Sequence, residues 1–278
     1  MKIIVLGSTG MLGSQVFDHF FKKNYEITGT FRGKLPEKMK KKYSEKKFIK
    51  VDDIFSKNFL DKLKKYDCII NCIGVIKQNT NIDKKALFRI NSSFPFHIFQ
   101  SIKNTNTYFI HLSTDCVFSG RVGNYNEAHI PDPIDDYGLS KLFGEVKGNN
   151  VLVIRTSIIG HELNSRKSLV DWFLGQKEIE GFSKAYFTGL PTEEIAEIIE
   201  KYLIPNKITG LYHIAGNKIS KHELLCLVND TYQANVIIRE DKNFEIDRSL
   251  NSDKFKKLTE YMAKDWRNLI KKMHSSKI

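Results

Sequence analysis

Short apolar runs alternate with longer amphipathic stretches along this chain. Runs rich in β-branched residues occupy 2–7, 25–31, 67–74, 108–114, 151–157 and 210–216. Continuous apolar runs of this length are typical of strands buried on both faces, and helical periodicity between them indicates βαβ units. The pattern predicts an α/β fold built on a doubly wound parallel sheet, the Rossmann architecture.

The second half of the chain is less regular. After Arg155 the segments 168–176, 192–203 and 221–232 have the periodicity of helices. No long linker, repeat or low-complexity tract separates them from the first half. We therefore expect a main domain over residues 1–155 and a smaller C-terminal lobe over 156–278.

Composition narrows the class of protein. Apolar residues make up 41% of the chain, and no apolar run approaches the roughly 18 residues that a membrane span needs. The first residues resemble a buried strand more than a secretory signal. The 4 cysteines and 8 histidines show no metal-ligand spacing. We expect a cytoplasmic protein with no membrane partner and no metal.

A formal net charge of +12 accompanies a concentration of lysines between Lys34 and Lys50. The first interpretation is a solvated loop and helix. A basic patch beside a phosphate-bearing ligand and a nucleic-acid footprint are the alternatives. No nucleic-acid-binding motif accompanies the charge, so we expect no nucleic-acid partner.

A glycine-rich turn joins the first predicted strand to the first predicted helix. Gly7, Gly10 and Gly13 follow the spacing G-x-x-G-x-x-G. Glycines there permit a tight turn and close approach of backbone N–H groups to a pyrophosphate at the helix N-terminus. The turn predicts a dinucleotide site in residues 1–155, with contacts from Gly7, Thr9, Gly10, Met11, Leu12 and Gly13.

The residues after the second strand indicate the form of the dinucleotide. Arg32 stands where a binder of NAD usually presents a carboxylate, and no Asp or Glu occurs from Ile27 to Leu35. A guanidinium suits a 2′-phosphate, so we expect NADPH, with NADH as the alternative. Arg32 as an ordinary exposed loop residue is the competing interpretation. Further cofactor contacts are expected from Asp52 or Asp53 and from Cys72, Ile73 and Gly74.

Hydroxyl and carboxyl groups follow a strand that should be buried on both faces. Ser113, Thr114 and Asp115 end the apolar run at 108–112, a position that would place them in a cleft. Downstream, Tyr137 and Lys141 are four residues apart and share one helix face. A nearby ammonium favours the phenolate, so this pair can exchange a proton. The expected buried side of that helix contains Leu139, Leu142, Phe143 and Val146.

Together these motifs resemble the extended short-chain dehydrogenase/reductases, most closely the dTDP-4-dehydrorhamnose reductase branch. The resemblance rests on the three glycines, "STDCVF", "YGLSKLFGE", "VIRTSIIG", "GLPT", "GLYHIAG" and "DRSL". It implies that Thr114 binds the reacting oxygen, Tyr137 transfers the proton and Lys141 holds the nicotinamide ribose and lowers the pKa of Tyr137. Ser113 would support the strand end or contact the cofactor.

The same resemblance implies a substrate pocket, and two positions depart from the family pattern. Cys116 replaces the Glu of the 4,6-dehydratases and the Tyr usual in the rhamnose reductases, and Ile158 replaces a Trp. Asp115, Cys116, Ile158 and Arg248 are the expected substrate-binding residues. The acidic metal ligand of some relatives is Gln15 here, so no metal is carried over.

We therefore predict NADPH-dependent reduction of a dTDP- or UDP-linked 4-keto-6-deoxy sugar in surface polysaccharide synthesis. The altered pocket leaves an N-acetylated UDP sugar open as substrate. A nucleotide-sugar 4-epimerase is one alternative. Another is a non-catalytic nucleotide-binding subunit, such as the regulatory subunit of methionine adenosyltransferase. Homodimers are common in this superfamily, but no residue pattern in this sequence indicates a dimer interface.

Overall fold

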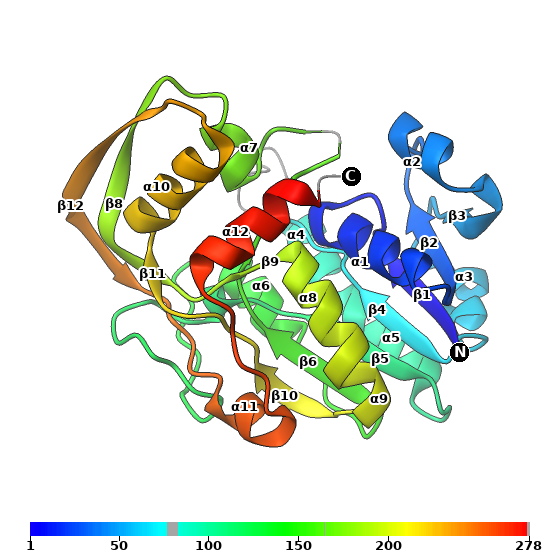
Figure 1. Ribbon diagram of the computed structural model, residues 1–278. Coiled ribbons are helices and arrows are strands. Elements are labelled where there is room, and N and C mark those ends of the chain that lie inside the picture. The colour runs from blue at the N-terminus through cyan, green and yellow to red at the C-terminus, as the bar shows by residue number, and fades with distance from the viewer. Residues whose placement is uncertain (77–82, 164, 277–278) are drawn as a thin grey trace.

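A seven-stranded parallel sheet forms the centre of the molecule (Figure 1). The computed structural model describes residues 1–76, 83–163 and 165–276. The strand order β10-β6-β5-β4-β1-β2-β3 reverses between β1 and β4, so the predicted doubly wound α/β fold is confirmed. The strands are β1 (Lys2–Leu6), β2 (Glu26–Phe31), β3 (Phe48–Lys50), β4 (Cys68–Asn71), β5 (Tyr108–Leu112), β6 (Val151–Arg155) and β10 (Gly210–His213).

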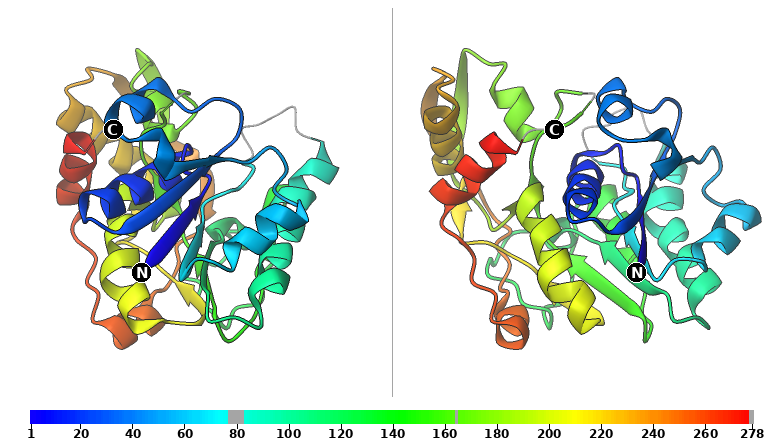
Figure 2. Two further views of the ribbon diagram at one scale, coloured as in Figure 1. Left: turned by 90° about the vertical axis from the view of Figure 1, so that its right-hand side faces the viewer. Right: turned by 45° about the vertical axis from the view of Figure 1, so that its right-hand side comes forward.

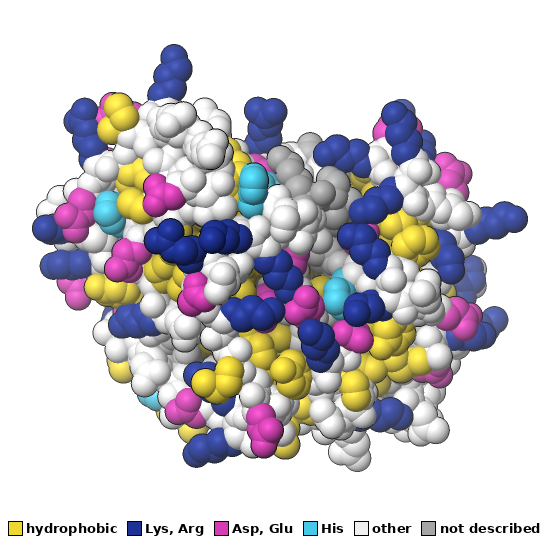
Figure 3. Space-filling view, in the orientation of Figure 1, with side chains coloured by type: hydrophobic (Ala, Val, Ile, Leu, Met, Phe, Trp, Pro, Cys, Tyr) yellow, Lys and Arg dark blue, Asp and Glu magenta, His cyan; other side chains and the backbone are white. Residues whose placement is uncertain are grey.

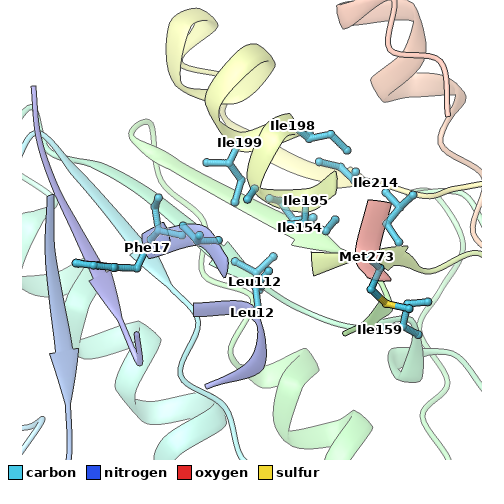
Figure 4. Close-up of a cluster of buried hydrophobic side chains, with 14 of the residues drawn as sticks. Leu12, Phe17, Leu112, Ile154, Ile159, Ile195, Ile198, Ile199, Ile214 and Met273 are labelled. Carbon is cyan, nitrogen blue, oxygen red and sulfur yellow. The ribbon is translucent and has the colours of Figure 1, made fainter. Parts of the chain in front are cut away.

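Two hydrophobic cores lie on the two faces of this sheet. Ile3 and Val5 of β1 point into one core, and Ile4 and Leu6 into the other, because side chains alternate along a strand. Figure 4 shows residues of α1, α8 and neighbouring strands meeting in the first core. A fully buried aliphatic or aromatic side chain contributes about 1.5–3 kcal/mol. The helices are α1 (Met11–Lys22) and α8 (Thr192–Ile198) on the first face, with α3 (Lys57–Leu63) and α5 (Phe94–Ile102) on the second.

A smaller lobe packs beside the main sheet (Figure 1). Its three-stranded sheet has the order β11-β8-β12, and α10 packs against β8. The strands β7 and β9 pair with each other at the junction. The elements are β7 (Ile158–Ile159), β8 (Glu178–Phe187), β9 (Leu190–Pro191), β11 (Ile219–Ser220), α10 (Lys221–Tyr232) and β12 (Ile237–Asp247).

The expected boundary at residue 155 does not divide the chain cleanly. β10 pairs with β6 along four residues, and α8 packs against α1 on the main sheet. The segment 192–213 therefore goes with residues 1–155, while the chain on both sides of it supplies the three strands of the small lobe (Figure 2). The physical reason is that β10 completes the backbone hydrogen bonding of β6, which would otherwise be an open edge.

The remaining helices are mostly short, and none in the described part of the chain is long and apolar enough to cross a membrane. The lysines of α2 are exposed, and acidic side chains lie among the basic ones on the face drawn in Figure 3. These helices are α2 (Glu37–Lys42), α4 (Lys84–Phe88), α6 (Asp136–Phe143), α7 (Leu169–Phe173), α9 (Ile204–Asn206), α11 (Asp253–Thr259) and α12 (Trp266–Ser275). Tighter or wider turns are η1 (Glu45–Lys47), η2 (Arg89–Ser93), η3 (Asp115–Val117) and η4 (Ile199–Leu203).

Candidate active site

The glycine-rich turn is a tightly closed loop between β1 and α1. Gly7 has a φ of +77°, and a Cβ added at Gly13 would lie 2.2 Å from the Gly7 carbonyl oxygen. Thr30 of β2 fixes the loop, because its Oγ1 accepts from Gly7 N at 3.0 Å and its carbonyl oxygen accepts from Ser8 Oγ at 3.0 Å. The backbone is thus held close to the N-terminus of α1, as the sequence predicts.

This loop fits the pyrophosphate of a dinucleotide. Gly10 is the N-cap of α1, no side chain caps the helix, and its first turn contains no acidic residue. The first N–H groups of a helix lack intrahelical acceptors and attract anions. Thr9 and Met11 are half-buried. The side chain of Leu12 lies in the core, so Leu12 would contact the cofactor through its backbone N–H.

The other expected cofactor residues surround the same edge of the sheet. Arg32 is exposed immediately after β2. Asp52 and Asp53 are exposed after β3; Asp52 pairs with Lys50 at 3.1 Å, and Asp53 Oδ1 accepts from Phe55 N at 2.9 Å. These two carboxylates have structural partners, and their contact with adenine stays a prediction.

The turn at Cys72, Ile73 and Gly74 links the dinucleotide loop to the predicted catalytic lysine. A Cβ on Gly7 would lie 2.9 Å from Ile73 Cγ1, so the two loops are in close contact. A Cβ on Gly74 would lie 3.9 Å from Lys141 Nζ. The turn therefore places the ammonium group beside the backbone where the nicotinamide half of a dinucleotide would lie.

Helix α6 rests directly on the loop that follows β5. A Cβ on Gly138 would lie 2.2 Å from the Cys116 carbonyl oxygen, so only glycine permits this approach. Asp135 Oδ1 caps the helix by accepting from Gly138 N at 2.8 Å. The close approach brings the Tyr137 hydroxyl beside the Thr114 side chain, which acts to lower the pKa of the phenol. Two of the predicted catalytic residues are thereby in direct contact.

Thr114 organises the backbone after β5. Its Oγ1 accepts from Cys116 N at 3.1 Å and donates to Asp115 Oδ1 at 3.1 Å. A chain of contacts thus runs from the Tyr137 phenol through Thr114 to the buried Asp115 carboxyl group. Burial raises the pKa of Asp115, although Lys221, Thr114 and Arg248 oppose this shift.

Burial shifts the pKa of both members of the Tyr–Lys pair. It raises the pKa of Tyr137 above its usual value, and the negative charge that Cys116 and Asp115 can carry adds to this. Lys141 Nζ donates to the Leu112 carbonyl oxygen at 2.5 Å, and burial lowers the pKa of Lys141 to about 8. Tyr137 is therefore a neutral phenol, suited to donating a proton.

Ser113 has a contact that fits the first of its two expected roles, support of the strand end. Its Oγ donates to Glu145 Oε1 at 2.6 Å. The same carboxylate accepts from Arg155 Nε at 2.8 Å and Nη2 at 2.7 Å. This buried group of residues joins β5, β6 and the end of α6 directly beneath Lys141.

Removing the Glu145 carboxylate should strongly destabilise the protein. In Glu145→Ala the Arg155 guanidinium, which is 4% exposed, loses its anionic partner, and such a loss costs about 3–5 kcal/mol. Urea unfolding followed by circular dichroism measures this. The exposed pair of Glu178 and Arg239 supplies the control, because Glu178→Ala should leave the midpoint unchanged. Equal midpoints for both variants would contradict the assignment.

Asn91 is a site residue that the sequence analysis missed. It lies in the π-helical turn η2, a kind of helix irregularity often found at functional sites. Its side chain is buried and bonds to the Val75 N and O at 2.9 and 3.0 Å and to Ser140 Oγ at 3.0 Å. Asn91 thus ties the turn after β4 to α6. A single Asn within a helix gives no sequence signal for this role.

The substrate side of the site is formed by both lobes. Arg248 Nε donates to the Phe118 carbonyl oxygen at 3.1 Å, and its Nη1 lies 3.6 Å from Cys116 Sγ. Lys221, which the sequence analysis did not single out, is coupled electrostatically to Asp115 and Cys116. Ile158 is half-buried and packs against the main core. Three of the four expected substrate residues therefore lie together at Asp115, Cys116 and Arg248.

The packing of α6 differs in part from the expected one. The helix buries Gly138, Ser140 and Lys141, whereas Phe143 is 63% exposed, so the prediction that Phe143 is buried was wrong.

Gln15 stands where some relatives have an acidic metal ligand. Its side-chain amide donates to the Ser276 carbonyl oxygen at 3.4 Å. Within residues 1–76, 83–163 and 165–276, no group of three His, Cys, Asp or Glu side chains could hold a metal ion.

The doubly wound sheet, the dinucleotide loop and the Thr114, Tyr137 and Lys141 arrangement define an extended short-chain dehydrogenase/reductase. The family model for the RmlD substrate binding domain matches residues 1–277. The chain belongs to that family, the dTDP-4-dehydrorhamnose reductase-like branch of the superfamily.

Solved structures agree with this placement. A hypothetical dTDP-4-dehydrorhamnose reductase from Sulfolobus tokodaii is 27% identical, with a TM-score of 0.79 over 96% of this chain and 98% of that one. A dTDP-4-dehydrorhamnose reductase from Bacillus anthracis in complex with NADP is 19% identical, with a TM-score of 0.80 and 99% of each chain covered. The latter shows the same fold.

The curated relatives include a protein of a different kind. Methionine adenosyltransferase 2 subunit beta of Rattus norvegicus is 24% identical over 250 residues, 83% of this chain and 72% of the relative. A probable low-salt glycan biosynthesis reductase, Agl14, of Haloferax volcanii is 28% identical over 171 residues, 57% of this chain and 54% of the relative. The reductases among the matches indicate a family of oxidoreductase kind. The same family also has relatives named as subunits of another enzyme.

Proposed function

We propose that the protein reduces the 4-keto group of a nucleotide-linked sugar with NADPH. The observation that supports this most directly is the contact of the Tyr137 phenol with Thr114, beside Lys141 and the dinucleotide loop. When bound, NADPH supplies the hydride. Gly7, Gly10 and Gly13 would hold its pyrophosphate, and Arg32 its 2′-phosphate, with NADH the weaker alternative.

The chain's own residues would orient the substrate and supply the proton. A carbonyl oxygen placed beside both hydroxyls would accept from the Tyr137 hydroxyl, and from Thr114 Oγ1 once that hydroxyl turns away from Asp115. The raised pKa of Tyr137 keeps its proton available until the oxygen gains negative charge. Lys141, fixed by the Leu112 carbonyl oxygen, would bind the nicotinamide ribose. A positioned acid of this kind accelerates such a step by about 10²–10⁴-fold.

The substrate is proposed to be a dTDP- or UDP-linked 4-keto-6-deoxy sugar. Support comes from the family of dTDP-4-dehydrorhamnose reductases and from the haloarchaeal relative named as a glycan biosynthesis reductase. We propose a role in surface polysaccharide synthesis in the cytoplasm, with a homodimer as the assembly. Asp115, Cys116 and Arg248 would contact the sugar, and Ile158 would line the pocket from the junction of the lobes.

A non-catalytic nucleotide-binding subunit is the second candidate. It is favoured by the relatives named methionine adenosyltransferase 2 subunit beta. The intact contact between Thr114 and Tyr137 favours an enzyme, because a protein that only binds nucleotide has no use for a buried proton donor. A 4-epimerase would use the same residues but would not consume NADPH.

We expect NADPH to be oxidised in the presence of one member of a panel of dTDP- and UDP-linked 4-keto sugars. The sugars are made in place by a 4,6-dehydratase, and loss of reduced nicotinamide absorbance is followed. A dehydratase reaction without this protein is the control. Binding of NADPH without its oxidation across the whole panel would contradict the reductase and favour the regulatory subunit. Isomerisation of a sugar without consumption of NADPH would favour the epimerase.

A further inference from the structure

Two cationic side chains lie beside the site, Lys221 at the start of α10 and Arg248 directly after β12. Ser220 of β11 pairs with Tyr186 of β8, and Lys221 is the next residue after Ser220. On the other side of β8, Arg248 N donates to the Tyr186 carbonyl oxygen at 3.2 Å. Both residues therefore start from the carboxyl end of β8 and extend toward the loop at 114–118. We call Lys221 and Arg248 the cation pair.

Arg248 is fixed by the protein itself. Its Nε donates to the Phe118 carbonyl oxygen, and its Nη1 approaches the Cys116 sulfur. These contacts orient the guanidinium along the loop that presents Thr114 and Asp115. Part of its hydrogen-bonding capacity is thus already used by the fold.

Lys221 is different, because the described residues offer its ammonium group no hydrogen-bond acceptor. Nζ lies 3.5 Å from the centroid of the Phe187 ring, on which the side chain rests. The charges that act on it are those of Asp115 and Cys116. Burial lowers the pKa of Lys221 to about 8, and the negative charges of Asp115 and Cys116 oppose this shift.

Capping of α10 does not require a lysine at this position. Lys221 is the first residue of α10, where the helix dipole disfavours a cation. Ser220 and Glu223 cap the helix without it, through a reciprocal capping box. Lys218, three residues earlier, is an instructive contrast: it is paired with Asp247 at 2.6 Å and partly exposed. Lys218 has an anionic partner, whereas among the described residues the ammonium group of Lys221 has the Phe187 ring beside it and no ion pair.

We propose that Lys221 is a substrate-recognition residue whose ammonium group binds an anionic oxygen of the nucleotide-linked sugar beside Thr114. This inference rests on the proposed function. The cation pair and the single carboxylate of Asp115 leave an excess of positive charge at the sugar position. A second anion would balance it, either an oxygen of the diphosphate or a carboxylate on the sugar ring.

The test compares binding of Lys221→Met with that of the wild type by isothermal titration calorimetry at saturating NADPH. The probes are UDP, dTDP, UDP-glucose and UDP-glucuronic acid. A hydrogen bond to a charged group is worth about 1.5–3 kcal/mol, so we expect binding to weaken by about 10- to 100-fold. Weakening with every probe identifies the diphosphate. Weakening with UDP-glucuronic acid alone identifies a sugar carboxylate.

Matched variants separate recognition from structure. Lys218→Met removes a nearby ammonium that has its own partner and should bind every probe as the wild type does. Lys221→Arg keeps the charge and should retain part of the affinity. Thermal unfolding and NADPH affinity of Lys221→Met should equal those of the wild type, which shows that the site is intact.

Two results would overturn the inference. One is wild-type affinity of Lys221→Met for all four probes, and the other is a wild-type protein that binds none of them. Failure of the proposed reduction gives a different result, because the titrations require no turnover. Weakened binding by Lys221→Met together with no NADPH oxidation on any sugar would reject the reductase and retain Lys221 as a recognition residue.

Discussion

Tyr137→Phe is expected to lower kcat for sugar reduction by about 10²–10⁴-fold, the usual contribution of a positioned acid. The substitution removes one hydroxyl, which contacts Thr114, and leaves the ring in place. The dinucleotide loop lies on other elements, so NADPH affinity should stay within a factor of about two, well under 1.4 kcal/mol. Steady-state kinetics with the sugar identified from the panel, together with NADPH titration, measures both quantities.

Tyr66→Phe supplies the control for this experiment. Tyr66 follows α3 and packs against the core on the far side of the sheet from α1, so its hydroxyl should not affect the rate. An unchanged rate in Tyr137→Phe would remove the proposed proton donor. Equal loss of rate and of NADPH affinity would instead indicate that the ring position, and not the hydroxyl, had been altered.

Gly13→Ala is expected to weaken NADPH binding by more than about 100-fold, because a new Cβ would lie 2.2 Å from the Gly7 carbonyl oxygen and 2.8 Å from its carbon. Backbone atoms cannot move aside as a side chain can, so the loop must open and its N–H groups lose their common direction. Fluorescence titration of NADPH measures the affinity. Thermal unfolding of the same variant shows whether the rest of the fold is retained.

Gly175→Ala is the matched glycine variant. A Cβ there would come no closer than 3.4 Å to its nearest neighbour, which is ordinary contact. This variant should bind NADPH as the wild type does. Tight NADPH binding by Gly13→Ala would show that the loop does not hold the pyrophosphate.

The main sheet was predictable because its strands are buried on both faces and read as continuous apolar runs. The strands β8 and β12 escaped prediction for the opposite reason. β12 is mostly exposed, and its sequence "IIREDKNFEID" is dominated by charge. Its pairing with β8 depends on residues about 60 positions apart, and local periodicity contains no information about such pairing. The return of β10 to the main sheet was hidden in the same way.

The residues of the site also fall into those that the sequence predicts and those that it does not. Thr114, Tyr137 and Lys141 belong to short motifs next to recognisable elements, so their convergence could be predicted. Asn91 and Glu145 contact residues of other elements, and Lys221 approaches the site from the small lobe. Each is an ordinary residue in its own local sequence. The orientation of α6 was misjudged because Gly138 lets a polar helix face approach the loop closely, whereas apolar periodicity alone favours burial of Phe143.

The position of β10 also determines which fragments of the chain can be studied. A fragment that stops after β6 would present the hydrogen-bonding groups of Val151–Arg155 to solvent as a bare apolar edge. Such edges recruit strands from other molecules. The dinucleotide-binding half therefore depends on residues 192–213 for its solubility. Dissection of cofactor binding from sugar binding has to rely on point substitutions within the full chain instead of on truncation.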